Sequence, residues 1–291
     1  MQITTEDYHE FKPLLFSLGY RMLGSITEVE DSIQETFLKA YQIDTEDIDN
    51  KKAYLCKIMT NRCLDVLKSA RYKREQYIGP WNPEPLLIDQ PASYDPAESI
   101  LQKEGLSIAY LRMMEFLRPE ERAVLLLREV FNFTYLEIAA MIDKKEENCR
   151  KMFSRAKQKM APVQDESLDY KNNKSIIDRF IQAFQTQDQD VLLELISDKV
   201  TLHSDGGGKV NAATRPIISA PNVLNFLYGI MKKMTGDFDF EVKMVNYQPG
   251  ILIFIQNQLQ SVFSFYIYEG KINEMYITLN PDKLRVQSIG N

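Results

Sequence analysis

The chain has 291 residues, of which 44% are hydrophobic and 26% charged, and its formal net charge is −6 at pH 7. This length suits two or three folded domains, and the composition is that of an ordinary globular protein. The sequence lacks a run of about 18 apolar residues, and its acidic start lacks the layout of a signal peptide. We therefore expect a cytoplasmic protein with no membrane partner, in which any contact with nucleic acid depends on local basic patches.

The three cysteines are odd in number and widely separated at positions 56, 63 and 149. Each lies inside a helical pattern, which favours reduced thiols in a hydrophobic core over disulfides or zinc ligands. We expect no metal site and no cofactor.

Residues 8–78 have helical periodicity. The pattern predicts a helix over 28–41, capped by Thr27, and a second over 51–74 with a basic outer face. The 28–41 helix is predicted to bury Leu38 and Tyr41 together with Val29, Ile33 and Phe37, and to expose Asp31, Gln34 and Glu35.

Two motifs in this region resemble a known family. Asp31-x-x-Gln34-Glu35-x-Phe37-Leu38-x-x-Tyr41 is similar to the region 2 signature of bacterial extracytoplasmic-function sigma factors, and residues 53–71 resemble the segment that follows it. The resemblance implies that Asp31, Gln34, Glu35, Phe37 and Leu38 dock on the β′ clamp helices of core RNA polymerase. It also implies that the following helix melts and reads the promoter −10 element, which suits cations and aromatics beside a single strand. The residues so implied are Asn61, Arg62, Lys68, Arg71 and Arg74. The alternative is a generic helical bundle with surface charge.

Residues 79–96 break the helical period and are rich in proline, which predicts an extended linker. The single tryptophan of the chain, Trp81, lies in it and is expected to dock in a groove. The stretch Trp81-Asn82-Pro83-Glu84-Pro85 resembles a motif of the sigma-factor branch in which a SnoaL-like domain is fused behind region 4.

Helical periodicity resumes at Ala97, and Pro119 is suited to the first turn of a helix. From Thr134 to Met160 two short amphipathic patterns flank the break Asp143-Lys144-Lys145, which predicts a helix-turn-helix. A helical hairpin with a solvated basic face is the alternative. The block resembles sigma region 4, which implies binding to the −35 element and to the polymerase β flap. Glu146 and Glu147 repel phosphate, so we expect stronger DNA contact at Arg150, Lys151 and Arg155 than near Asn148. The expected DNA-binding residues are Asn148, Arg150, Lys151, Arg155 and Lys157.

The last 120 or so residues, from about 170 to 291, change from all-helical to mixed character. Helices are predicted over 176–184, 191–196 and 223–231, and strands over 238–245, 251–256, 261–268 and 271–278, with turns at Pro249-Gly250 and 269–271. This α+β pattern with a curved antiparallel sheet resembles the SnoaL-like cone fold, also used by ketosteroid isomerases. Two further motifs match the same sigma-factor branch: Asp205-Gly206-Gly207-Gly208-Lys209 and Asn280-Pro281-Asp282-Lys283-Leu284.

An enzymatic cone domain would need a base, and His203 with Asp205 is the candidate pair. The pair has little support, because no second histidine follows and no metal-ligand spacing is present. The three glycines favour a tight turn or a close backbone approach, and anion binding through backbone N–H groups is the alternative.

The patterns predict a multidomain protein with two all-α parts and an α+β part, and the resemblance implies that these are two sigma domains and a SnoaL-like domain. The expected boundaries are 1–78 (region 2), 79–96 (linker), 97–163 (region 4) and 170–291 (cone). The expected function is promoter selection for core RNA polymerase, without catalysis. The resemblance further implies regulation in cis by the cone, through the linker and the 205–209 and 280–284 motifs. Two rivals are a helix-turn-helix regulator that never enters polymerase, and a DNA-tethered domain that binds or converts a small molecule. An unidentified ligand in the cone is left open.

Overall fold

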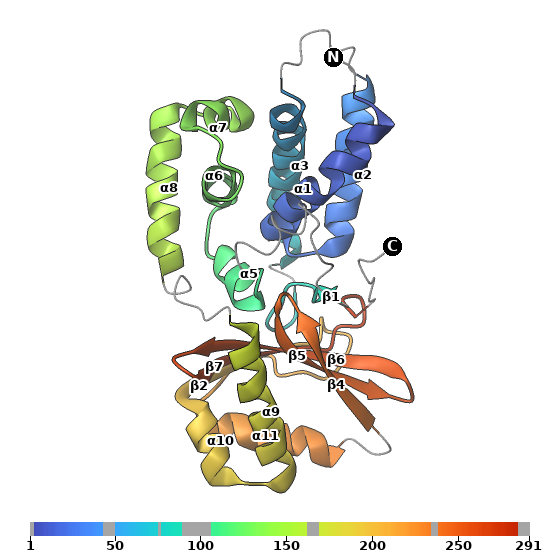
Figure 1. The fold of residues 1–291 in the computed structure, drawn as a ribbon, viewed down its shortest axis with the longest axis vertical. Helices are drawn as coiled ribbons and strands as arrows, with labels where there is room; N and C mark the ends of the chain where they lie inside the picture. The colour runs from blue at the N-terminus through green and yellow to red at the C-terminus, as the bar shows by residue number, and fades with distance from the viewer. Residues whose placement is uncertain are drawn as a thin grey trace. The chain divides into compact units, whose positions relative to one another are not determined.

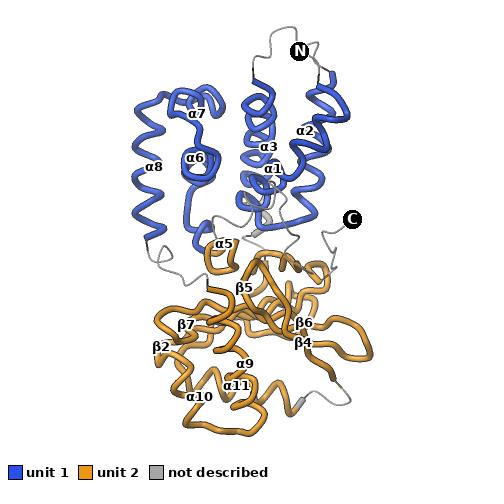
Figure 2. Tube along the Cα trace, viewed as in Figure 1, with its two compact units in different colours: residues 1–76, 92–104, 113–162 blue, residues 77–91, 105–112, 163–291 orange. Residues whose placement is uncertain are grey.

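The computed structural model describes residues 3–42, 50–74, 77–88, 106–161, 169–233 and 238–284. The chain forms two compact units (Figure 2). The first comprises residues 1–76, 92–104 and 113–162, and the second comprises residues 77–91, 105–112 and 163–291. The predicted helical start at Ala97 lies outside the described residues.

The first unit begins with three helices, α1 (Thr5–Leu23), α2 (Ile26–Gln42) and α3 (Lys51–Arg74) (Figure 1). A capping box starts α1, and Gly24 ends it with a φ of 67°, a conformation that glycine adopts at low cost. The predicted cap of α2 was wrong. The helix begins at Ile26, two residues before the expected start, and the Ser25 hydroxyl accepts a hydrogen bond from the Glu28 amide at 3.4 Å.

The rest of the first unit holds the predicted helix-turn-helix. After α5 (Ile108–Met114), which begins in the second unit, come α6 (Pro119–Glu129), α7 (Tyr135–Ile142) and α8 (Glu146–Met160). Thr134 and Glu137 form a capping box at the start of α7, and Asp143 ends α7 with a φ of 51°. The tight turn at Asp143 therefore fixes the direction of α8, as a helix-turn-helix requires.

The second unit contains a seven-stranded sheet in the order β1-β4-β5-β6-β7-β2-β3. The strands are β1 (Leu87–Ile88), β2 (Ile196–Asp205), β3 (Ile217–Ile218), β4 (Phe238–Val245), β5 (Gln248–Ile255), β6 (Gln258–Tyr268) and β7 (Lys271–Thr278). The predicted antiparallel meander corresponds to β4 through β7. β2 is an addition that the sequence did not reveal, and it pairs parallel to β7.

One predicted turn of this meander was wrong. Pro249 and Gly250 lie within β5, and the chain reverses at Asn246 and Tyr247, whose φ values are 52° and 61°. Positive φ at both central residues is what a type I′ hairpin turn needs, and asparagine tolerates it well.

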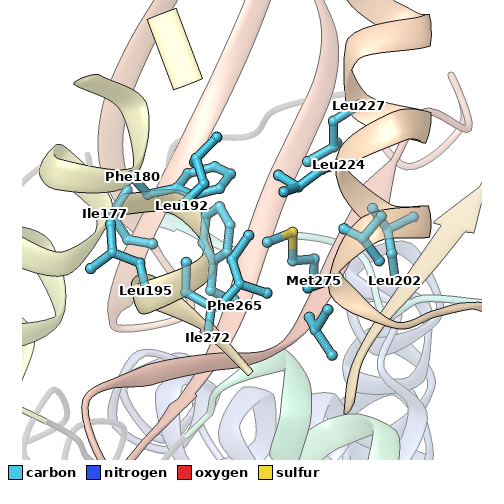
Figure 3. Packing of buried hydrophobic residues seen from close by; sticks show 14 of the residues in the cluster. Ile177, Phe180, Leu192, Leu195, Leu202, Leu224, Leu227, Phe265, Ile272 and Met275 are labelled. Carbon is cyan, nitrogen blue, oxygen red and sulfur yellow. The ribbon is translucent and has the colours of Figure 1, made fainter. Parts of the chain in front are cut away.

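Three helices, α9 (Tyr170–Thr186), α10 (Gln189–Leu195) and α11 (Ala220–Lys233), complete the second unit and cover one face of the sheet (Figure 1). Phe180 of α9 and Leu227 of α11 pack toward Phe265 and Met275 of the sheet (Figure 3). This layered core gives the α+β cone architecture expected from the sequence.

Candidate functional sites

The α2 surface combines exposed polar and apolar side chains. Asp31 and Gln34 are exposed, and Leu38 and Tyr41 are 60% and 44% exposed. The predicted burial of these last two was therefore wrong. Phe37 is buried and lies 4.8 Å from the Tyr8 ring, centroid to centroid. Large apolar side chains left in water beside acids are typical of a protein-binding surface.

Two of the expected DNA-binding residues on α3 are engaged inside the first unit. The Asn61 amide donates to the Met141 carbonyl of α7 at 2.9 Å, and Arg62 pairs with Glu35 at 2.9 Å. Lys68 is exposed and 3.3 Å from Asp65. Arg71 and Arg74 belong to α3, but their side chains lie outside the described part of the chain.

The helices before and after the linker pack against each other within the first unit. α3 contacts both α6 and α7, and α1 contacts α6. Arg122 of α6 is only 3% exposed, donates to the Met22 carbonyl of α1, and lies 3.1 Å from the Glu115 carboxylate. In this arrangement the amide of Asn61 is held by the helix-turn-helix instead of facing outward to a promoter strand.

The α8 surface presents its basic side chains in ion pairs. Arg150 pairs with Glu146 and Lys151 with Glu147, both at 2.6 Å and both one helical turn apart. Lys157 is 2.5 Å from Glu129 of α6. Exposed pairs of this kind contribute about 0.3–0.5 kcal/mol each, so a phosphate can replace the glutamates at small cost. Asn148 and Arg155 are exposed on the same helix.

A third site lies in the second unit, where the linker is held by the cone domain. We call it the linker clasp and define it as Tyr77, Trp81, Asn82, Asp205 and Lys283. Asp205 has no exposed surface. Its carboxylate accepts hydrogen bonds from the Tyr77 hydroxyl at 2.6 Å and from the backbone N–H of Asn82 at 2.8 Å. It also pairs with the Lys283 ammonium at 2.8 Å. Asp205, expected in a regulatory motif, thus binds the linker directly.

Lys283 closes the linker clasp from the 280–284 motif. Its ammonium donates to the Asn82 carbonyl at 2.6 Å and lies 4.2 Å from the Trp81 ring centroid, a cation–π contact. Asn280 adds a hydrogen bond to the Tyr77 hydroxyl at 3.0 Å. Burial and the hydrogen bond to Asp205 raise the pKa of Tyr77, so its hydroxyl stays a donor at neutral pH.

The glycine motif is explained by close approach. Gly207 and Gly208 have φ values of 59° and 70°, and a Cβ on Gly207 would lie 2.3 Å from the Asn280 amide nitrogen. The Gly207 N–H donates to the Asp205 carboxylate at 3.0 Å, so this donor is already used within the chain. Lys209 forms an exposed ion pair with Asp282.

The linker continues from the clasp into the sheet. Pro83 and Pro85 are buried, Glu84 is half-buried, and β1 then pairs with β4. Asn246 bonds the backbone of Leu86 through both its amide N–H and its side-chain oxygen, at 2.8 and 2.9 Å, and its side-chain nitrogen donates to the Leu106 carbonyl at 2.9 Å. Sequence reasoning missed Asn246, although its position in a hairpin turn offered a signal. At the other end of the motif, Pro281 is exposed and Leu284 packs against the small cluster around Leu87.

His203 and Asp205, the candidate base pair, have different partners in the structure. His203 lies 3.3 Å from the Arg112 guanidinium, and its ring stacks on Tyr276. Burial and the charge of Arg112 lower the pKa of His203 to about 3. Arg112 also donates to the carbonyl of Trp81 at 2.5 Å. Both groups therefore serve to hold the linker. The described residues contain no cluster of side chains suited to a metal.

The cysteines have the structural role expected of them. Cys56, Cys63 and Cys149 are free and buried. Burial raises the pKa of Cys56 and of Cys63 to about 12, which leaves both thiols protonated and unreactive. No helix in the described part of the chain is long and apolar enough to cross a membrane.

Comparison with known proteins gives these sites a context. Residues 8–72 match Sigma-70 region 2, and residues 107–160 match Sigma-70 region 4. A helical region 2 followed by a region 4 helix-turn-helix defines a transcription factor of the sigma-70 class.

Two relatives from Mycobacterium tuberculosis match nearly the whole chain. The probable ECF RNA polymerase sigma factor SigI is 30% identical over 93% of this chain and 91% of its own length. The ECF sigma factor SigJ is 26% identical over 95% of this chain and 92% of its own length. The crystal structure of SigJ has the same fold, with a TM-score of 0.76 at 24% identity, covering 96% of this chain and 98% of SigJ. The chain belongs to the ECF RNA polymerase sigma factors, and its C-terminal α+β sheet domain lies within the fold that it shares with SigJ.

Proposed function

We propose that this sigma factor is regulated in cis by its C-terminal domain through the linker clasp. The observation that carries the proposal is the buried pair of Asp205 and Lys283, which together bind both backbone groups of Asn82. Asn82 lies in the segment that joins regions 2 and 4. A domain that holds this segment restricts the paths by which the two regions can separate.

In this proposal the sigma half alternates between a packed and an open population. The packed population has Asn61 bonded to Met141 and Arg122 buried. The open population frees α3 for the −10 element and α8 for the −35 element. Core polymerase favours the open population because it binds regions 2 and 4 at separate places.

In this proposal, separate surfaces of the sigma half contact the polymerase and the promoter. The α2 surface with Leu38 and Tyr41 binds the β′ clamp helices, and region 4 binds the β flap. The α3 residues engage the −10 element, and α8 the −35 element with Arg150, Lys151 and Arg155. The protein acts in the cytoplasm, where RNA polymerase works.

We also infer that the chain catalyses no reaction of its own. His203 is held neutral beside Arg112, and the Asp205 carboxylate is surrounded by donors from the linker and Lys283. A general base needs a lone pair that a substrate proton can reach. The Nδ1 atom of His203 faces the Arg112 guanidinium at 3.3 Å, and both carboxylate oxygens of Asp205 accept hydrogen bonds from within the chain.

Run-off transcription with bacterial core polymerase tests the regulation. Full-length protein is compared with Lys283→Ala, with a version ending near Gln164, and with Lys174→Ala. Lys174→Ala removes an exposed lysine of α9 that pairs with Asp178, outside the regulatory motifs, so it is the matched control. We expect Lys283→Ala and the truncated version to change promoter-dependent transcript yield several-fold in the same direction, and Lys174→Ala to behave as the parent. Equal yields from all four proteins would refute regulation through the clasp.

A separate readout tests the polymerase contact. Leu38→Asp should abolish binding to core polymerase, since it places a charge in the apolar part of the α2 surface. Leu193→Asp, on α10 and 44% exposed, is the control. Retained binding by Leu38→Asp would reject this surface as the docking site.

A further inference from the structure

The second unit contains an apolar cavity distinct from the linker clasp. It has a volume of about 140 Å³ and lies between α9, α11 and the sheet. Phe180 and Phe184 of α9, Leu227 of α11 and Ile253 of β5 form its walls. Gln185 and Ser261 supply the polar groups of the lining, and no lining residue in the described chain is charged.

The lining defines the chemistry of an occupant. Transfer of an ionised group into such a site is costly without a partner charge, so the ligand is uncharged. A dry cavity of about 150 Å³ lined by aliphatic and aromatic side chains accommodates benzene. The cavity therefore suits a neutral molecule of about one aromatic ring or a short hydrocarbon chain. The candidate bases of the domain, His203 and Asp205, are absent from the lining, so the site is suited to binding instead of conversion.

The end of β7 connects this cavity to the linker. Ile277 and Leu279 line the cavity. The Ile277 carbonyl accepts a hydrogen bond from the Asn82 side chain at 3.2 Å, and the Leu279 N–H donates to the Asp205 carbonyl at 2.8 Å. Two residues thus place side chains on the cavity and backbone atoms on the linker clasp. A displacement of either side chain by a ligand acts directly on the groups that hold Asn82 and Asp205.

We propose that the cavity is a sensor site for a small uncharged apolar molecule, and that its occupancy is transmitted to the linker clasp through residues 277–279. The effect on transcription rests on the function proposed above. Binding and transmission themselves are properties of the free chain and need no polymerase.

The chain carries its own reporter, because Trp81 is its single tryptophan and belongs to the linker clasp. Toluene serves as the probe, since it is neutral, fits the cavity and does not absorb at 295 nm. Full-length protein is titrated with toluene while heat is measured by calorimetry and Trp81 emission is excited at 295 nm. We expect saturable heat and a saturable change in Trp81 emission with the same midpoint.

Matched substitutions assign the signal to the cavity. Leu227→Phe fills part of the cavity and should weaken toluene binding at least tenfold, whereas Leu193→Phe makes the same change on the exposed side of α10 and should bind as the parent. Ser261→Leu is a second filling variant for the case in which Leu227→Phe does not unfold cooperatively. Equal binding by parent and filling variants, or no saturable heat at all, would overturn the site. Saturable heat with unchanged Trp81 emission would overturn the transmission. Neither result would alter the effect of Lys283→Ala on transcription, so the two proposals fail separately.

Discussion

The α8 surface and the linker clasp use the same kinds of charged group with opposite consequences. On α8, Arg150 and Lys151 are 60% and 61% exposed and pair with glutamates that water can replace. In the clasp, Lys283 and Asp205 are 8% and 0% exposed and are surrounded by hydrogen-bond partners from the linker. Exposed pairs are weak and exchangeable, which suits a surface that meets DNA phosphates. A buried pair is costly to break on one side, which suits a contact that must hold a segment in place.

The largest loss of folding stability is expected when one member of the buried pair is removed. Asp205→Ala leaves the Lys283 ammonium buried without its carboxylate, and should lower the free energy of unfolding of the second unit by about 3–5 kcal/mol. Urea unfolding of the full chain measures this loss. Asp282→Ala removes a carboxylate from an exposed pair and should cost less than about 1 kcal/mol. Similar losses in both variants would remove the distinction between the two kinds of site.

Arg122 extends the comparison to the first unit. Arg122→Ala should destabilise that unit by about 3 kcal/mol, because it removes a buried guanidinium that pairs with Glu115 and donates to the Met22 carbonyl. Arg155→Ala, on the exposed face of α8, should be nearly neutral in the same unfolding experiment. A neutral Arg122→Ala would indicate that the packing of α6 on α1 depends on apolar contacts alone.

His203, which is buried beside Arg112, gives the stability of the second unit a pH dependence. Its folded pKa of about 3 lies below the value of about 6.5 in an unfolded chain, so the unfolded state binds more protons as the pH falls below 6.5. The folded state should therefore lose about 2 kcal/mol between pH 7 and pH 5 through this group. Urea midpoints at the two pH values measure the loss. His203→Gln should reduce the dependence by that amount, and an unchanged pH profile would show that the histidine has the same pKa in the folded and unfolded states.

The smallest effect concerns the start of the helix-turn-helix. Thr134→Ala removes the side-chain acceptor of the α7 capping box and should cost about 1 kcal/mol. Thr186→Ala, at the exposed end of α9, is the control because it caps no helix start. Thermal unfolding measured by circular dichroism distinguishes the two variants. Equal unfolding midpoints for Thr134→Ala and Thr186→Ala would show that α7 is held in place by packing alone.

The sequence revealed those parts of the fold that depend on local signals. Helical periodicity located α2, α3, α7 and α8 to within a few residues, and alternation located the four strands of the meander. β2 was not predicted, because Asp198 and Lys199 interrupt its apolar pattern and because its partner strand, β7, lies far along the chain. Pro249 and Gly250 were assigned to a turn by residue type, while the register with β4 and the positive φ of Asn246 and Tyr247 place the turn three residues earlier.

The residues of the linker clasp were predicted as parts of three separate motifs. The contacts that join these motifs were not predicted. Trp81, Asp205 and Lys283 were singled out individually by resemblance. Tyr77 was placed only in the general helical region 8–78, and Arg112 was not considered, because a partner on a distant segment leaves no periodic trace. The burial of Leu38 was mispredicted because an apolar residue at helical spacing is the same in sequence whether it faces a core or a binding partner.

The pairing of β1 with β4 has a consequence for states in which the linker leaves the domain. Leu87 and Ile88 cover Val245 and Met244 at the edge of the sheet. Withdrawal of the linker uncovers the backbone donors and acceptors of that edge, and an open edge recruits strands from other chains. Each release of the linker therefore exposes an edge strand that can pair with another chain. Rapid binding to polymerase, or rapid return of β1 to β4, limits this self-association.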